Sequence, residues 1–82
     1  MKAKIGDVIL NHYAKENNWP HQKAIVISTN RYATRAIAIG PNNSVDIVTY
    51  TPDFETNDNY ERIGHVNLAE VFSKLIDDNS NE

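Results

Sequence analysis

Residues 23–51 read KAIVISTNRYATRAIAIGPNNSVDIVTYT, and this stretch decides the fold of the chain. Lys23–Thr29 is rich in β-branched residues, which favour a central strand, and isoleucines alternate with alanines along Thr34–Gly40. The Gly-Pro-Asn-Asn sequence at residues 40–43 predicts a tight turn, because Gly and Asn tolerate a positive φ and Pro fixes its own. Val45–Thr51 alternates again between two faces. We therefore predict three consecutive antiparallel strands joined by short turns.

Two further strands are predicted on either side of these three. Ile5–Tyr13 contains a compact apolar run typical of a buried strand, and the polar segment Ala14–Pro20 is predicted to be a long hairpin loop. Pro52–Asn59 is a polar excursion in which Phe54 is expected to act as a hydrophobic anchor. Tyr60–Val66 supplies the last strand, and its glycine indicates a bend or a bulge.

One helix is predicted, at the C-terminal end of the chain, over Asn67–Ile76. Asn67 is a suitable N-cap and Glu70 stands three residues further on, as in a capping box. Apolar residues recur at helical spacing, at Leu68, Val71, Phe72, Leu75 and Ile76. We expect this stripe to cover an open end of the sheet. Residues 77–82 contain no apolar side chain and are expected to form a disordered acidic tail, so residues 1–76 make up the single domain.

These elements predict a mainly β fold, a small five-stranded antiparallel SH3-like barrel with a C-terminal capping helix over residues 67–76. An OB-fold also has five strands, but it usually places its helix between the third and the fourth. Here that position is occupied by the tight turn at residues 40–43, which favours the SH3-like arrangement. Closing the barrel would let so short a chain bury enough apolar surface to be stable.

Composition and charge exclude several classes of protein. The chain has 82 residues and no cysteine, so disulfides, cysteine zinc sites and thiol nucleophiles are impossible. Its apolar runs are too short to span a membrane, and no apolar stretch for a signal peptide follows the first residues, so we expect a cytoplasmic protein. The net charge of −3 is uneven: residues 1–40 hold six cations and two acids, and residues 41–82 two cations and nine acids. An overall acidic balance disfavours strong non-specific binding of nucleic acid.

The polar residues do not form a recognisable catalytic or metal-binding motif. The three histidines, His12, His21 and His65, are not spaced like a compact set of metal ligands. No nucleophile-elbow glycine pattern surrounds Ser28, Ser44 or Ser73. We therefore expect no enzyme activity, no metal and no cofactor.

The aromatic residues are the best candidates for a binding site. Tyr13 and Trp19 flank the first long loop, and Tyr32 lies in the next turn. In an SH3-like barrel these two segments are expected to be neighbours, so the rings would form one exposed ledge. Cations border the ledge in sequence, at Lys23, Arg31 and Arg35. Such a surface suits a peptide or a single-stranded nucleic acid. The alternative is that the rings fold back and seal the mouth of the barrel.

Two stretches resemble the PemK/MazF-like growth-inhibitor family, SH3-like barrels that act as cytoplasmic ribonucleases. They are the Gly-Asp-Val-Ile-Leu opening at residues 6–10 and the Gln-Lys-Ala-Ile-Val-Ile-Ser run at residues 22–28. The catalytic arginine of that family would fall at Gln22 or Lys23, and the proline that follows it is replaced by Ala24. Thr49 or Thr51 would stand near its second catalytic position. The resemblance therefore implies a relative of this fold without the nuclease activity.

The whole chain also resembles the small, Asn-rich SH3-like proteins carried by phages and mobile elements of low-GC bacteria. The shared features are the Gly-Asp opening and the Ile-Gly-His-Val-Asn-Leu sequence at residues 63–68. This resemblance implies an accessory protein without enzyme activity. We expect it to act as a binding module for a protein partner, with nucleic acid as the alternative partner and no membrane association. The oligomeric state stays open.

Overall fold

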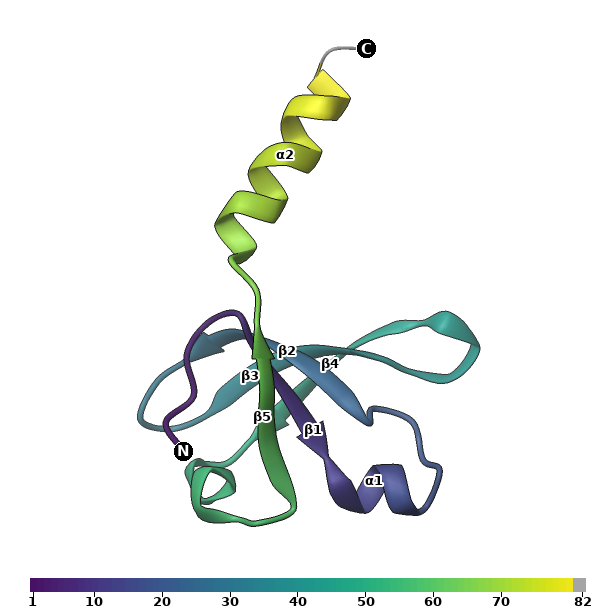
Figure 1. The fold of residues 1–82 in the computed structure, drawn as a ribbon, viewed down its shortest axis with the longest axis vertical. Helices are drawn as coiled ribbons and strands as arrows, with labels where there is room; N and C mark the ends of the chain where they lie inside the picture. The colour runs from purple at the N-terminus through teal and green to yellow at the C-terminus, as the bar shows by residue number, and fades with distance from the viewer. Residues whose placement is uncertain (81–82) are drawn as a thin grey trace.

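The computed structural model describes residues 1–80, with side chains described up to Asp78. Its elements follow in the order β1 (Asp7–Asn11), α1 (His12–Glu16), β2 (Lys23–Thr29), β3 (Thr34–Ile39), η1 (Pro41–Asn43), β4 (Val45–Tyr50), η2 (Pro52–Thr56), β5 (Tyr60–His65) and α2 (Leu68–Ser80). Figure 1 shows the strands gathered in one body and α2 extending away from it.

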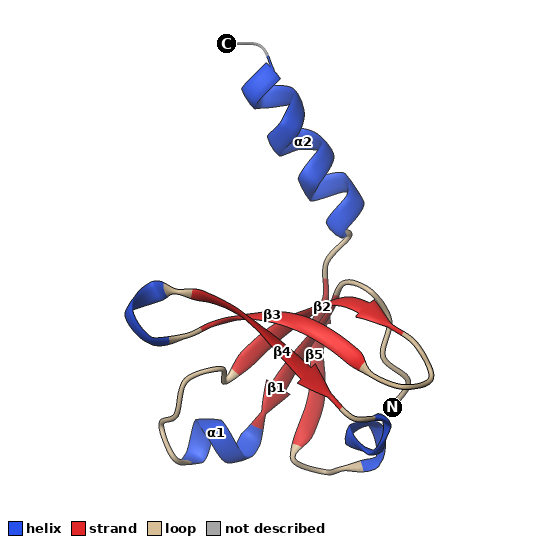
Figure 2. Cartoon of the chain, turned by 180° about the vertical axis from the view of Figure 1, so that it is seen from behind, coloured by secondary structure: helices blue, strands red, loops and turns tan. Residues whose placement is uncertain are grey.

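The five strands form one antiparallel sheet in the order β4-β3-β2-β1-β5. Strands β1 to β4 form a meander, and β5 returns to pair with β1 (Figure 2). The predicted number and direction of the strands are therefore confirmed, and a break in register beside Gly64 lies where a bulge was predicted. The predicted closure is wrong, because β4 and β5 are both edges of the sheet and no backbone pairing joins them.

The core lies on the inner face of this curved sheet. Ile9 from β1 and Val26 from β2 are almost fully buried, and Phe54 from η2 packs in the same cluster. The ring of Phe54 stacks on Tyr50, with centroids 4.9 Å apart, and meets Tyr60 edge-on at 5.7 Å. Phe54 is therefore the hydrophobic anchor that the sequence predicted, and it packs between the ends of β4 and β5.

Strand β3 buries its small residues and exposes its large ones. Ala36 and Ala38 are 0% and 3% exposed, whereas Ile39 is 59% exposed. Tyr50 and Val48 pack against the alanines, so the bulky groups of the neighbouring strand fill the space that larger residues would occupy. The consequence is an outer face on which isoleucine side chains reach the surface.

The loop after β1 contains a short helix that the sequence analysis did not predict. The side-chain oxygen of Asn11 accepts hydrogen bonds from the backbone N–H groups of Tyr13 and Ala14, at 3.1 and 3.2 Å, and so caps α1. Ala14, a residue of this helix, is buried. The prediction of a loop over residues 14–20 is therefore wrong for residues 14–16, because a local cap supports one turn of helix there.

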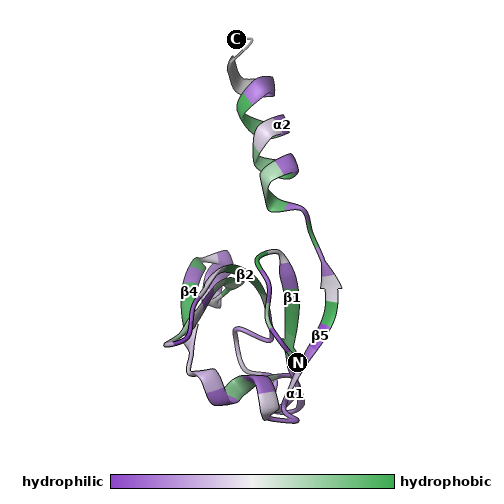
Figure 3. Cartoon of the chain, turned by 90° about the vertical axis from the view of Figure 1, so that its left-hand side faces the viewer, coloured by the Kyte–Doolittle hydropathy of each residue, from purple (hydrophilic) through white to green (hydrophobic). Residues whose placement is uncertain are grey.

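Helix α2 forms where it was predicted, but it does not cap the sheet. The side chain of Asn67 accepts a hydrogen bond from the N–H of Glu70 at 3.1 Å, which confirms the predicted N-cap. The helix then runs away from the strands (Figure 3), and Phe72 in its apolar stripe is 51% exposed. Residues 77–80 of the predicted tail continue the helix, and residues 81–82 lie outside the described residues.

The direction of α2 has a local cause at the end of β5. The backbone N–H of Val66 donates to the carbonyl of Gly6 at 2.7 Å, and the N-cap residue Asn67 follows at once. The helix therefore begins two residues after an anchored point, and it points away from the sheet.

Candidate binding surface

An exposed pair of aromatic rings lies in the connection between β1 and β2. Tyr13 on α1 and Trp19 in the following loop meet edge to face, with centroids 5.2 Å apart and ring planes at 83°. The two residues are 53% and 50% exposed. We call this pair the aromatic shelf. This arrangement leaves apolar ring surface accessible to a partner, and the edge-to-face contact stabilises the positions of the two rings.

Backbone hydrogen bonds hold the shelf in place. The N–H of Trp19 donates to the carbonyl of Ala14 at 2.9 Å, and the side-chain amide of Asn17 donates to the carbonyl of Tyr13 at 2.8 Å. Asn18 adopts a φ of 54°, in the left-handed region that Asn tolerates better than most residues. The loop therefore fixes where Trp19 leaves the backbone, and the shelf is formed before any partner binds.

A hollow of about 400 Å³ lies between Trp19 and Ile39, next to the shelf. His21 lines it, with its backbone N–H donating to the carbonyl of Ile39 at 3.3 Å and its ring Nε2 2.6 Å from a carboxylate oxygen of Asp46. Lys23 lines the same hollow and is exposed. The shelf and the hollow together offer aromatic, aliphatic and cationic groups, a combination that suits the side chains of a protein partner.

The other predicted site residues lie at the far end of β2. Tyr32 occupies the β2–β3 turn and is 69% exposed, with the guanidinium of Arg31 4.7 Å from its ring centroid. Arg35 follows on the outer face of β3. The seven residues of β2 separate this turn from the shelf, roughly 20 Å of extended chain. The prediction of one continuous ledge is therefore wrong: Tyr13 and Trp19 come together, and Tyr32 does not join them.

Each histidine contacts a carboxylate of its own. The pairs are His12 with Glu61 at 2.9 Å, His21 with Asp46 at 2.6 Å and His65 with Asp7 at 2.9 Å. Between residues 1 and 80, no three histidine, aspartate or glutamate side chains gather where they could hold a metal ion.

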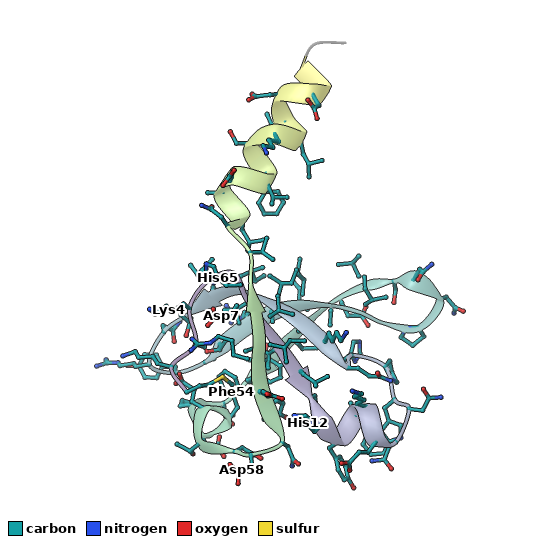
Figure 4. All side chains as sticks on the ribbon, in the orientation of Figure 1. Lys4, Asp7, His12, Phe54, Asp58 and His65 are labelled. Carbon is teal, nitrogen blue, oxygen red and sulfur yellow. The ribbon has the colours of Figure 1, made fainter. Side chains whose placement is uncertain are left out.

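Asp7 is a buried carboxylate that the sequence analysis did not select. It is 2% exposed and accepts a hydrogen bond from the backbone N–H of Lys4 at 2.9 Å. The Nδ1 atom of His65 lies 2.9 Å from one carboxylate oxygen, and Arg62 donates to the other at 3.4 Å. Figure 4 shows Lys4, Asp7 and His65 gathered beside β5. We call these four residues the Asp7 clasp, because they join the N-terminal segment to the last strand.

The clasp shifts the ionisation of its carboxyl group. Burial by itself would raise the pKa of Asp7, but hydrogen bonds from His65 and Lys4, and both the hydrogen bond and the charge of Arg62, outweigh burial and hold that pKa below its usual value. No local sequence pattern indicated this contact, because it joins the first strand to the last.

Replacing Asp7 by Asn should lower the free energy of unfolding at neutral pH by about 1–3 kcal/mol, because the clasp loses its ionised acceptor. The pKa of Asp7 in the folded protein lies below the unfolded value of 3.8. The ionised carboxylate therefore stabilises the fold above about pH 4, and this contribution is lost as the pH falls below 3.8 towards the folded pKa. Thermal unfolding of both proteins from about pH 7 to about pH 3 measures the difference.

The stability difference between wild type and Asp7→Asn should narrow in acid. Asp46→Asn is the matched control, since Asp46 also pairs with a histidine but its side chain is 38% exposed. It should change the free energy of unfolding by less than about 1 kcal/mol. A difference between wild type and Asp7→Asn that stays constant down to about pH 3 would contradict the assigned role of the carboxylate.

No helix between residues 1 and 80 is both long and apolar enough to cross a membrane. Comparison with known proteins gives no significant match to a family model, to a curated protein or to a solved structure. The function is therefore inferred from the shelf, the hollow and the clasp themselves.

Proposed function

We propose that this chain is a non-enzymatic module that binds a protein partner through the aromatic shelf. The observation that carries the proposal is the Tyr13–Trp19 pair, two large rings that are half exposed and held by backbone hydrogen bonds. Rigid aromatic side chains lose little conformational entropy on binding and are enriched among the residues that dominate binding energy. Lys23 beside the hollow would select a partner with acidic groups near its apolar anchor.

We also propose that the fold is SH3-like. The order β4-β3-β2-β1-β5 supports this assignment, because a four-stranded meander is followed by the short helix η2 and by a fifth strand that pairs with the first. The resemblance to small phage and mobile-element proteins supports a cytoplasmic accessory role in a bacterial host. That resemblance rests on the Gly-Asp opening and on residues 63–68.

Replacing Trp19 by alanine should abolish partner binding while leaving the protein folded. The ring is half exposed and lies outside the two core clusters, so its loss should change the free energy of unfolding by less than about 1 kcal/mol. The measurement is an affinity capture from host extract with immobilised full-length chain, in which captured proteins are compared between wild type and variant. The melting temperature of each is measured in parallel.

Tyr32→Ala is the matched control, because it removes another exposed ring, 69% exposed against 50% for Trp19, from the other end of β2. Proteins captured by wild type and by Tyr32→Ala, but not by Trp19→Ala, support the shelf as the binding surface. Equal capture by all three proteins, or unfolding of Trp19→Ala, would show that the shelf does not bind the partner.

Nucleic acid is the second candidate ligand, and a different observation favours it. Arg31 lies over the ring of Tyr32 in an exposed turn, and Arg35 follows on the next strand. An aromatic ring beside two cations can stack on a base and contact phosphate. A gel shift of single-stranded RNA that weakens with salt and is lost in Arg31→Ala would support this candidate, which the net charge of −3 disfavours.

If the chain is a relative of the PemK/MazF-like ribonucleases, we expect it to lack their ribonuclease activity. Lys23, the cation nearest the catalytic position implied by the PemK/MazF resemblance, lies at the start of β2, and β3 separates it from the start of β4. Thr49 lies four residues further along β4, roughly 13 Å from that end. The cation that pairs directly with Thr49 is Arg35 on β3, not Lys23. The absence of the family's arginine and of the proline that follows it, at residues 22–24, is therefore what supports binding rather than catalysis.

A further inference from the structure

Large apolar side chains cross the outer face of the sheet in register. One row is built from directly paired residues on all five strands, in the order Ile47, Ile37, Ile25, Val8 and Gly64. A second pair, Ile39 and Val45, stands beside this row. A groove of about 290 Å³ follows the part of the row on β1, β2 and β3 and the Ile39–Val45 pair, and it is lined almost entirely by apolar atoms. We call it the outer groove.

The folded monomer leaves the outer groove open. Ile39 and Val45, which line it, are 59% and 66% exposed, and Ile47 beside it is 66% exposed. These are three of the larger side chains of the sheet, and they stand next to alanines that are buried. Contiguous apolar surface of this kind is uncommon on monomers and marks a surface that another element covers.

Helix α2 is a second open apolar surface on the same chain. Val71, Phe72 and Ile76 lie on one stripe of the helix and are 42%, 51% and 65% exposed. The helix stands away from its own sheet, as Figure 3 shows, so no strand of this chain covers the stripe. An amphipathic helix of this kind gains its stability mainly by burying its apolar stripe against another surface.

The two surfaces match in length and in charge. The apolar stripe of α2 from Leu68 to Ile76 extends about 12 Å along the helix, and the groove residues on the four neighbouring strands β1 to β4 span about 14 Å. Lys23 lines the groove and Arg35 lies on the same face of β3 as Ile37 and Ile39, so the outer face is basic. The helix carries three acids, Glu70, Asp77 and Asp78, against one lysine.

We propose that the chain forms a homodimer in which α2 of each copy lies in the outer groove of the other. The anchored Val66 and the N-cap at Asn67 direct the helix away from its own body, so the groove that it meets belongs to a second copy. The exchange is reciprocal, and a twofold axis closes the assembly as a dimer. Tyr13 and Trp19 of the aromatic shelf do not line the outer groove, but Lys23 and Ile39 line both the groove and the hollow beside the shelf. The two proposals are separated by their measurements, because the mass in solution reports the dimer and affinity capture reports the partner.

The first test is the mass of the full-length chain in solution, measured by light scattering across a dilution series. The measured mass of the wild type should be twice the 9.3 kDa of one chain, and it should fall towards the mass of one chain on dilution. Phe72→Asp on the helix and Val45→Asp, at the edge-strand side of the outer groove, should each be a folded monomer. Ser73→Asp adds the same charge on the polar side of the helix and should stay dimeric, as should Trp19→Ala.

The second test identifies which surfaces meet by forming disulfides between introduced cysteines. The chain has no native cysteine, so no other disulfide can form. Two single variants, Ile37→Cys and Phe72→Cys, are mixed and oxidised. A disulfide between the two different chains is expected in most of the mixed protein. Lys74→Cys, on the polar side of the helix, replaces Phe72→Cys as the control and should give little of this product.

Three results would overturn the proposal. A wild-type chain that remains monomeric at every concentration would exclude the dimer. A disulfide formed within one chain of the double variant Ile37→Cys/Phe72→Cys would show that the helix folds back on its own groove. Disulfides between two copies of Phe72→Cys, with none to Ile37→Cys, would show that the helices pair with each other instead.

Discussion

Replacing Phe54 by alanine should lower the free energy of unfolding by about 3–5 kcal/mol, a large part of the roughly 4–12 kcal/mol expected for a domain of this size. Phe54 is 3% exposed and stands between Tyr50 and Tyr60, with which its ring makes stacked and edge-on contacts. Removing it opens a cavity beneath the edges of β4 and β5, which no backbone pairing joins. Urea unfolding followed by circular dichroism measures the loss.

Because the edge strands β4 and β5 are not paired with each other, Phe54→Ala should lower the free energy of unfolding by more than the loss of buried apolar area alone would. In a closed barrel, hydrogen bonds would hold β4 and β5 together, whereas here the aromatic cluster links them. Phe54→Leu keeps most of the volume and should cost roughly half as much as alanine. Tyr32→Ala removes a ring that is 69% exposed and serves as the control with little effect. A loss of less than about 1 kcal/mol for Phe54→Ala would show that η2 is not part of the core.

The strands were predictable because their signals are local. The β-branched run of β2 and the turn residues at 40–43 mark strand and turn within a few residues, and β2 spans the predicted range. Phe54 was predictable for a similar reason, since it is the one large apolar residue in a polar segment. No knowledge of the distant chain was needed for these elements.

The side of the sheet that faces the core was not predictable from the same patterns. An alternation of isoleucine and alanine shows that β3 has two different faces, but it does not say which one is inside. Tyr50 and Phe54 decide this, because they bring their volume to the alanine side from later in the chain. The position of α2 depends in the same way on Val66 and Gly6, sixty residues apart.

In the candidate site, too, the contacts between residues close in sequence were predictable and the contacts between distant residues were not. Tyr13 and Trp19 are close in sequence and were correctly predicted as neighbours. Grouping Tyr32 with them failed because the shelf lies near one end of the seven-residue strand β2 and Tyr32 lies in the turn at its other end. The Asp7 clasp joins residues 58 positions apart, and only the fold brings Asp7 to His65.

The two proposals combine into one functional unit. A dimer that exchanges α2 would carry two aromatic shelves, each lying outside the outer groove that the helix fills. Two linked sites raise the apparent affinity for a partner that is itself repeated or dimeric, without any new contact. Phe72→Asp would then weaken the capture of such a partner although the shelf is intact, whereas Trp19→Ala would abolish capture and leave the dimer unchanged.

Replacing Gly6 by alanine should lower the free energy of unfolding by about 2–4 kcal/mol, although the change adds only a methyl group. Gly6 has a φ of 96°, which side-chain-bearing residues rarely adopt, and a Cβ atom there would lie 2.0 Å from the backbone oxygen of Val66. The clashing atom belongs to the backbone, which cannot move aside as a flexible side chain could. The end of β5 must therefore shift, and the hydrogen bond from Val66 to Gly6 is strained. Thermal unfolding should show the melting temperature falling by roughly 10–20 °C.

Gly64→Ala is the matched control for this prediction, because it adds the same methyl group to the strand that Gly6 holds. A Cβ atom at Gly64 would meet only the side chain of Val8, at an ordinary contact distance of 3.8 Å, and its backbone needs no positive φ. That variant should change the free energy of unfolding by less than about 1 kcal/mol. Since the bond between Gly6 and Val66 also sets where α2 begins, Gly6→Ala should weaken dimer formation as well as stability. Equal stability of the two variants would mean that the N-terminal turn and the end of β5 do not approach each other so closely, and the fixed exit of α2 would then lose its physical basis.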